Sequence, residues 1–159
     1  MQRTAITIIL LGLLTACGFQ LRGDAQIGPQ FNPIYVDSGA LEPRQAVQLR
    51  QALQRAGAEL TDDFATANRL WVSLGSPKAQ KIAGSSLSDV ELRRVAMDLQ
   101  FRLSDSDGQT LLEDDIMRMR QIELDTNNVL AHERQLEQAG EQLQRELIRV
   151  MLFRMTHFR

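Results

Sequence analysis

The most regular pattern of hydrophobic and polar residues lies between positions 94 and 103. Hydrophobic residues occupy every second position there, separated mainly by polar or charged ones, and these residues are Val95, Met97, Leu99, Phe101 and Leu103. Side chains of a β-strand point alternately to its two faces, so this pattern predicts a strand with one buried face and one exposed face. We therefore expect these hydrophobic side chains to belong to the core.

Two other segments repeat their hydrophobic residues every three or four positions, which is typical of a helix with one buried face. The first begins at Pro43, which suits a first helical turn, buries residues such as Leu49, and ends before Gly57, which suits a C-terminal cap. The second follows possible N-terminal caps at 126–128 and places its apolar positions between 129 and 151. The sequence therefore predicts two amphipathic helices.

Three further segments have strand character. Residues 33–37 form a short β-rich run, residues 70–74 resume the pattern and continue less regularly toward Ile82, and a last strand runs from about 110 to 124. In the last strand, Met117 and Met119 fall on the phase opposite to Ile122 and Leu124. This change of phase predicts a bulge or a frayed end near Gln121.

The sequence Asp105-Ser106-Asp107-Gly108 separates the last two predicted strands. It begins like a calcium-binding loop, but a later acidic ligand at the required distance is not convincingly placed. Asp-Gly is also a favoured turn sequence between antiparallel strands. We therefore predict a hairpin turn rather than a calcium site.

The elements follow the order β-α-β-β-β-α. A strand, a helix and a second strand imply a parallel crossover, whereas the hairpin implies antiparallel pairing. The predicted class is α/β, as an α+β two-layer sandwich in which two helices pack on one face of a mixed four-stranded sheet. We assign residues 33–159 to one domain, because no repeat, low-complexity segment or second composition appears.

The N-terminal residues have the features of a bacterial lipoprotein signal. Arg3 is followed by an apolar run at 5–14 that is too short to span a bilayer, and small residues then precede Cys17. We predict a signal peptide at 1–16, acylation of the Cys17 thiol, and a lipidated tether at 17–32. An ordinary secretory signal with an incidental cysteine, or a short membrane anchor, are the alternatives.

The composition argues against nucleic-acid binding and against enzymatic chemistry. The chain has 18 Lys and Arg residues against 20 Asp and Glu residues, so it offers no basic excess to nucleic acid. Cys17 is the only cysteine, and neither His132 nor His157 has neighbours with metal-ligand spacing. Asp114 and Asp115 are adjacent in a strand, so they point to opposite faces and cannot share acid–base work. We expect no enzymatic activity, no metal site and no cofactor.

Four basic residues suggest a binding site instead. Lys78, Lys81, Arg93 and Arg94 flank the connection at 84–86, where a hairpin would bring them onto neighbouring strands. Lysine and arginine make strong charge-assisted hydrogen bonds to phosphate oxygens. The cluster is therefore a candidate site for lipid phosphate, although nothing in the spacing itself demands an anion, and the simpler interpretation is that four cations on a solvated sheet serve solubility.

The N-terminal motif extends beyond what a lipoprotein signal requires. The run Cys17-Gly18-Phe19-Gln20-Leu21-Arg22-Gly23 resembles the start of the LptE family, the lipopolysaccharide-assembly lipoproteins of the Gram-negative outer membrane. The length of the chain and the order of its elements are also similar to that family. Gly18 resembles the pattern that sorts lipoproteins to the outer membrane.

This resemblance implies a function and partners. It implies a lipid-anchored protein of the cell outer membrane whose domain lies on the periplasmic side or plugs the lumen of the β-barrel LptD, helps deliver lipopolysaccharide to the outer leaflet, and binds lipopolysaccharide. Two other functions stay open: a lipid carrier or chaperone lipoprotein without a barrel partner, and a cell-wall enzyme, which the missing catalytic residues disfavour.

Overall fold

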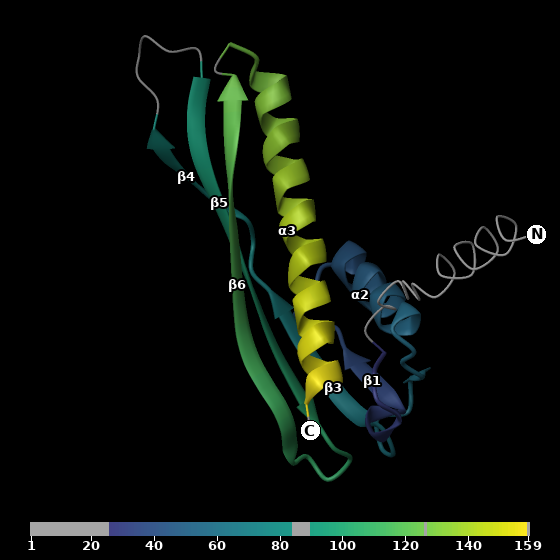
Figure 1. The fold of residues 1–159 in the computed structure, drawn as a ribbon. Coiled ribbons are helices and arrows are strands. Elements are labelled where there is room, and N and C mark those ends of the chain that lie inside the picture. Colours follow the sequence, from purple (N-terminus) through teal and green to yellow (C-terminus); the bar gives the residue numbers. More distant parts are fainter. Residues whose placement is uncertain (1–25, 84–89, 126, 159) are drawn as a thin grey trace, which may run out of the picture.

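The computed structural model describes residues 26–83, 90–125 and 127–158 (Figure 1). Both helices in this part of the chain lie on one side of a mixed sheet, as predicted, but the sheet has six strands rather than four. In chain order the elements are a short 3-10 helix η1 (Pro29–Phe31), β1 (Ile34–Asp37), α2 (Pro43–Arg55), β2 (Leu60–Thr61), β3 (Asn68–Leu74), β4 (Lys78–Ala83), β5 (Val90–Ser104), β6 (Thr110–Asp125) and α3 (Val129–His157).

The two additional strands are β2 and β4. β2 has two residues and pairs in parallel with β1, which also pairs in parallel with β3 across the predicted crossover. β4 is the less regular continuation of β3 that the sequence suggested, separated from it by Gly75, Ser76 and Pro77. β3 pairs with β5 at Leu99–Ser104 and β4 pairs with β5 at Leu92–Ala96, so one strand of 15 residues serves both.

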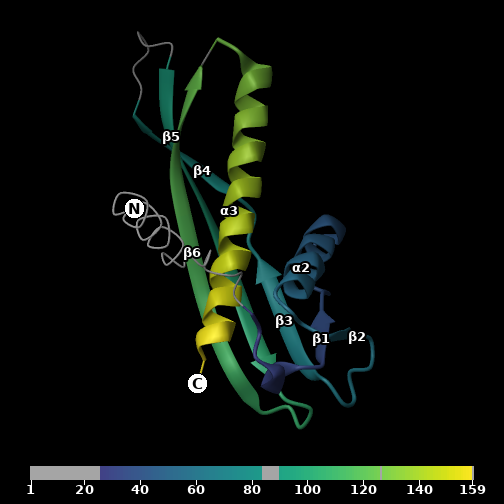
Figure 2. The same cartoon turned by 45° about the vertical axis from the view of Figure 1, so that its right-hand side comes forward.

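α2 has the predicted ends, α3 begins after the predicted caps and continues to His157, and both cover the same face of the sheet. α3 runs along the β5–β6 hairpin, and α2 lies beside its C-terminal half, next to β1 and β3 (Figures 1 and 2). The Asn128 side chain accepts a hydrogen bond of 3.0 Å from the backbone N–H of Ala131, which caps α3. Gly57 follows α2 with a φ of 80°, a conformation that favours glycine.

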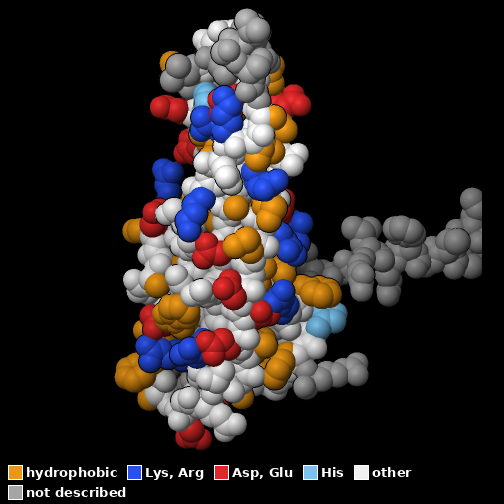
Figure 3. Space-filling view, turned by 90° about the vertical axis from the view of Figure 1, so that its left-hand side faces the viewer, with side chains coloured by type: hydrophobic (Ala, Val, Ile, Leu, Met, Phe, Trp, Pro, Cys, Tyr) orange, Lys and Arg blue, Asp and Glu red, His pale blue; other side chains and the backbone are white. Residues whose placement is uncertain are grey.

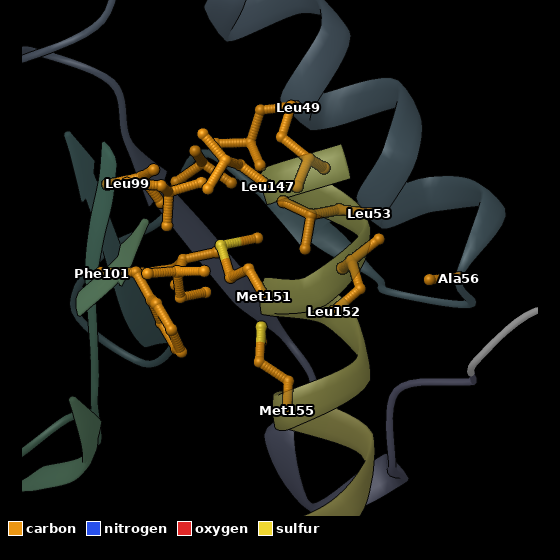
Figure 4. Packing of buried hydrophobic residues seen from close by; sticks show 14 of the residues in the cluster. Leu49, Leu53, Ala56, Leu99, Phe101, Leu147, Met151, Leu152 and Met155 are labelled. Atoms are coloured by element: carbon orange, nitrogen blue, oxygen red, sulfur yellow. The ribbon is translucent and has the colours of Figure 1, made fainter. Parts of the chain in front are cut away.

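The core lies between this face of the sheet and the helices. The alternating residues predicted for β5 are all buried, and Leu99 and Phe101 point toward Leu147 and Met151 of α3 (Figure 4). Leu49 and Leu53 extend the same cluster from α2, together with residues of β1 and β3. The period-2 pattern therefore identified the buried face of β5 correctly.

The last strand has nearly the predicted bounds, but the bulge or frayed end predicted near Gln121 was wrong. The pairing of β5 with β6 is continuous from Val90 opposite Asp125 to Leu103 opposite Leu112, with no bulge near Gln121. Ile116 and Leu124 are buried, whereas Met117 and Met119 are 60% and 56% exposed. The two methionines lie on the sheet face away from the helices, so β6 alternates between the two faces without interruption from Leu112 to Asp125, and the register shift of this pair lies at its other end, between Leu103 and Ser104.

The predicted hairpin turn is confirmed. The Asp105 carboxylate accepts hydrogen bonds from the backbone N–H groups of Asp107 and Gln109, at 3.0 and 2.8 Å. Gly108 has a φ of 83°, a left-handed backbone conformation that glycine adopts readily. Both hydrogen bonds go to Oδ1 of Asp105, so this carboxylate stabilises the turn.

Two described residues of the segment 17–32, which we assigned to the tether, pack into the core. Ile27 and Phe31 are 5% and 4% exposed and belong to the core. The Ile27 N–H donates a hydrogen bond of 2.8 Å to the carbonyl of Ala56 at the end of α2. Cys17, the signal segment 1–16 and the connection at 84–86 lie outside the described residues. Among the residues described, no helix is both long enough and apolar enough to cross a membrane.

Candidate functional site

The structure brings the four predicted cations onto two paired strands. Lys81 of β4 lies opposite Arg93 of β5, and Lys78 lies opposite Ala96, two positions from Arg94. Adjacent strand positions point to opposite faces, so Arg93 and Arg94 cannot lie on the same side. The cluster is therefore divided: Lys81 and Arg93 point to the helix side of the sheet, and Lys78 and Arg94 point to the outer face.

Lys81 and Arg93 are held by a carboxylate that the sequence analysis did not single out. Glu91 is only 8% exposed, and its Oε1 accepts a short hydrogen bond from Nε of Arg93. Its Oε2 lies 3.2 Å from Nζ of Lys81. The hydrogen bond from Arg93, with a further contribution from Lys81, holds the pKa of Glu91 below its ordinary value. These two cations therefore neutralise a buried carboxylate.

The alternation of β5 could have revealed this arrangement. Glu91, Arg93 and Val95 occupy every second position, so Glu91 shares the face of Arg93 and of the core. A carboxylate at that place needs a partner, because an unpaired buried charge is costly. The sequence therefore contained this information at Glu91, which lies just before the alternating segment 94–103.

Lys78 and Arg94 remain on the outer face as the two cations that could meet a phosphate. In an antiparallel pair, diagonal neighbours lie about 7–8 Å apart, close enough for two long side chains to reach one anion. Neither Lys78 nor Arg94 makes a side-chain hydrogen bond or ion pair with another described residue. The candidate phosphate site is thus reduced from four residues to two.

The other end of the outer face has a depression of about 660 Å³. Trp71 of β3 and Phe64 contribute aromatic side chains to it, and Arg69 and Arg102 contribute cations. Nη2 of Arg69 lies 2.6 Å from Oδ2 of Asp37, and this hydrogen bond holds the pKa of Asp37 below its ordinary value. Arg102 makes a similar bond of 2.6 Å to Glu113. Both cations of the depression are therefore already paired.

The remaining titratable residues that the structure describes do not converge on a site. Asp114 contacts Arg154 of α3, while Asp115 accepts a hydrogen bond of 3.4 Å from Gln100, so the two carboxylates face different neighbours. His157 Nδ1 lies 2.8 Å from the carbonyl of Phe153 within α3. Among the described residues, no group of three or more His, Cys, Asp or Glu side chains could hold a metal ion.

Comparison with solved structures shows which folds this chain resembles. A minor lipoprotein from Acinetobacter baumannii superposes with a TM-score of 0.65 at 16% identity, over 79% of this chain and 91% of that one. An uncharacterized lipoprotein B from Nitrosomonas europaea gives a TM-score of 0.67 at 16% identity, over 85% and 88% of the two chains. The rare lipoprotein B from Shewanella oneidensis gives 0.53 at 15% identity, over 77% and 88%.

These likenesses establish the fold. No protein-family model and no curated protein sequence matches the chain. At 15–16% identity, the solved structures share the arrangement of helices and strands with this chain, and each is covered over nearly its whole length. The domain therefore has a fold that these solved lipoproteins share.

Proposed function

We propose that this protein is an outer-membrane lipoprotein that acts with a large β-barrel of the LptD kind to deliver lipopolysaccharide to the outer leaflet. The observation that carries the proposal is the run at 17–23, in which the motif of the LptE family continues six residues beyond the acylated cysteine. A lipoprotein signal alone requires nothing after Cys17, so these residues point to a particular family of lipoproteins.

The fold supports this proposal at a coarser level. The similar solved structures are described as a minor lipoprotein, a lipoprotein B and a rare lipoprotein B. Among the described residues, the first to pack into the core is Ile27, ten positions after Cys17, so the acylated residue would lie close to the folded domain along the chain. Such a domain would be held near the membrane surface without crossing it.

The outer face of the sheet suits a polar barrel lumen. α2 and α3 pack on the opposite face, and charged side chains of both signs are interspersed over the side of β4, β5 and β6, with scattered hydrophobic ones between them (Figure 3). The interior of large membrane barrels is polar as well. A plug therefore needs many polar contacts over a broad surface rather than one apolar patch.

The same face carries the two cations that could contact lipopolysaccharide. Lys78 and Arg94 lie on neighbouring strands, and the phosphates of lipopolysaccharide are suitable acceptors for them. Lys81 and Arg93 support this site indirectly. Their ion pairs with Glu91 link β4 to β5, the two strands that carry Lys78 and Arg94.

A lipid carrier without a barrel partner is the second candidate. Such a carrier would need an apolar cavity between the helices and the sheet. Instead, Phe101, Leu147 and Met151 fill this space and are at most 1% exposed (Figure 4). The packing therefore favours the barrel-associated function.

Purification of the native protein from outer membranes in mild detergent tests the proposal. We expect a large β-barrel protein and lipopolysaccharide to co-purify with the wild-type protein. A Lys78→Gln, Arg94→Gln variant should retain the barrel but carry at least about tenfold less lipopolysaccharide, because the charge-assisted contacts are lost.

A matched control separates this site from a general effect of charge. Arg44→Gln, Arg134→Gln removes two exposed arginines of α2 and α3 and should leave both partners in place. Recovery of lipid without any barrel would favour the carrier. Recovery of neither partner would refute the proposed function.

A further inference from the structure

A groove of about 310 Å³ separates the two helices on the side away from the outer face. Its floor is apolar, and Ala56, Ile148 and Leu152 there are 3%, 5% and 8% exposed. The groove exists because α2 presents Ala52 and Ala56 to α3, and these small side chains leave space between the helices. Leu152 points from α3 toward the end of α2 that carries Ala56 (Figure 4).

The rim of this groove carries three arginines: Arg55 of α2, and Arg145 and Arg149 of α3. Arg145 and Arg149 are four positions apart on one helix face, an arrangement in which like charges repel. Arg55 donates to the Gln51 carbonyl at 3.2 Å. The lining contains no carboxylate.

The acidic groups near these arginines neutralise little of the positive charge on the rim. The only ion pair of Arg145 with a described residue is an exposed one of 3.5 Å with Glu141, and pairs of this kind contribute little. Arg149 has no hydrogen bond or ion pair with a described residue. The rim is thus a site of concentrated positive charge beside an apolar floor, which is the complement of an anionic amphiphile.

The position of the groove indicates where such a ligand would come from. Ala56, which lines the groove, accepts the hydrogen bond from Ile27, so the chain leaves toward Cys17 from this end of the helix pair. Ten residues span at most about 33–36 Å when fully extended. If Cys17 is acylated, as the proposed function assumes, the groove lies within that distance of the membrane surface.

We propose that this groove binds one anionic phospholipid of the membrane that holds the acyl anchor. The guanidinium groups of Arg55, Arg145 and Arg149 bind the phosphate, for which arginine offers bidentate hydrogen bonds. The first part of one acyl chain lies on the floor formed by Ala52, Ala56, Ile148 and Leu152. Binding there would orient the helix pair toward the membrane and leave the outer sheet face free for another partner.

Native mass spectrometry of the full-chain, detergent-solubilised protein tests this site. Dioctanoyl phosphatidylglycerol and dioctanoyl phosphatidylcholine are titrated separately, and bound lipids are counted. We expect one phosphatidylglycerol per protein and no comparable binding of phosphatidylcholine. Replacing Arg55, Arg145 and Arg149 by Gln should weaken the binding at least about tenfold.

Further variants separate this site from a general effect of charge, and a lipid from a simple anion. A control with Arg44, Arg118 and Arg134 replaced by Gln loses the same charge elsewhere and should bind like wild type. Ala52→Trp fills the floor while keeping every cation, and it should also abolish lipid binding. If the triple variant fails to fold, Arg149→Gln alone, an exposed change, should still weaken binding measurably.

Several results would overturn the proposal. Equal loss in the control variant would mean that only net charge matters. Wild-type binding by Ala52→Trp, or displacement of the lipid by an equal concentration of inorganic phosphate, would mean that the groove holds an anion without a lipid chain. These measurements count lipids on the purified protein, whereas co-purification tests the barrel partner. Either proposal can therefore fail without the other.

Discussion

Truncation of Phe101 tests the central claim about which face of β5 is buried. Phe101 is 1% exposed and points toward Met151 of α3, whereas its neighbour Gln100 is exposed on the outer face (Figure 4). Phe101→Ala removes a large buried side chain and leaves a cavity that the surrounding residues fill only partly. Changes of this kind cost about 3–5 kcal/mol.

The matched control is Gln100→Ala on the same strand. It loses a long hydrogen bond of 3.4 Å to Asp115 and should change stability by less than about 0.5 kcal/mol. For a domain of this size, the Phe101 variant should melt roughly 10–15 °C below the wild type, and the control within about 2 °C. Thermal unfolding followed by circular dichroism measures both. An equal or larger effect at Gln100 would refute the assigned phase of β5 and the packing of α3 upon it.

Three other changes test separate parts of the argument. The Cys17→Ser variant lacks the thiol that would accept the diacylglyceryl group, so mass spectrometry should find an unacylated protein that keeps its signal segment. Acyl chains on this variant would contradict the lipoprotein assignment. The pKa of Glu91 is lowered by its hydrogen bond with Arg93, so the pair stabilises the fold above the ordinary pKa of 4.5 and loses this effect as the pH falls below it. Glu91→Gln should therefore unfold at lower denaturant concentration than wild type at pH 7, with a difference that narrows as the pH falls below 4.5; a pH-independent difference would exclude the ion pair as its cause. Gly140→Ala places a methyl group 2.7 Å from Cγ of Pro77, which should cost about 1–3 kcal/mol, and Pro77→Ala in the same chain should recover part of this loss in a denaturant titration.

Local patterns were sufficient to predict most of the elements. The buried face of β5, the turn at 105–108, the ends of α2 and the start of α3 depend on neighbouring residues, and the sequence shows these directly. β6 was misread because Met117 and Met119 are hydrophobic residues on an exposed face, and hydrophobic character alone does not decide which phase is buried. Its pairing with β5 along the whole length decides it instead.

The candidate sites depended more on tertiary structure. The division of the four cations follows from strand alternation, so the sequence could have shown it once Glu91 was considered with Arg93. The groove between the helices could not be read in the same way. Arg55 and Arg149 are 94 positions apart, and only the packing of α2 against α3 brings them to the same rim.

The fold therefore places its two candidate contact surfaces on opposite sides. Lys78 and Arg94 lie on the outer sheet face, while Arg55 and Arg149 lie on the helix layer at the end where the chain leaves toward Cys17. A domain anchored through Cys17 that bound phospholipid by its helices would turn its sheet away from the anchoring leaflet. The face with mixed charges would then be free to enter a polar lumen, and its cations would meet phosphate groups arriving from a different direction than those of the anchoring membrane. Because one contact surface lies on the sheet and the other on the helix layer, one small domain would contact two anionic lipids at separate sites, and the two lipids would not compete.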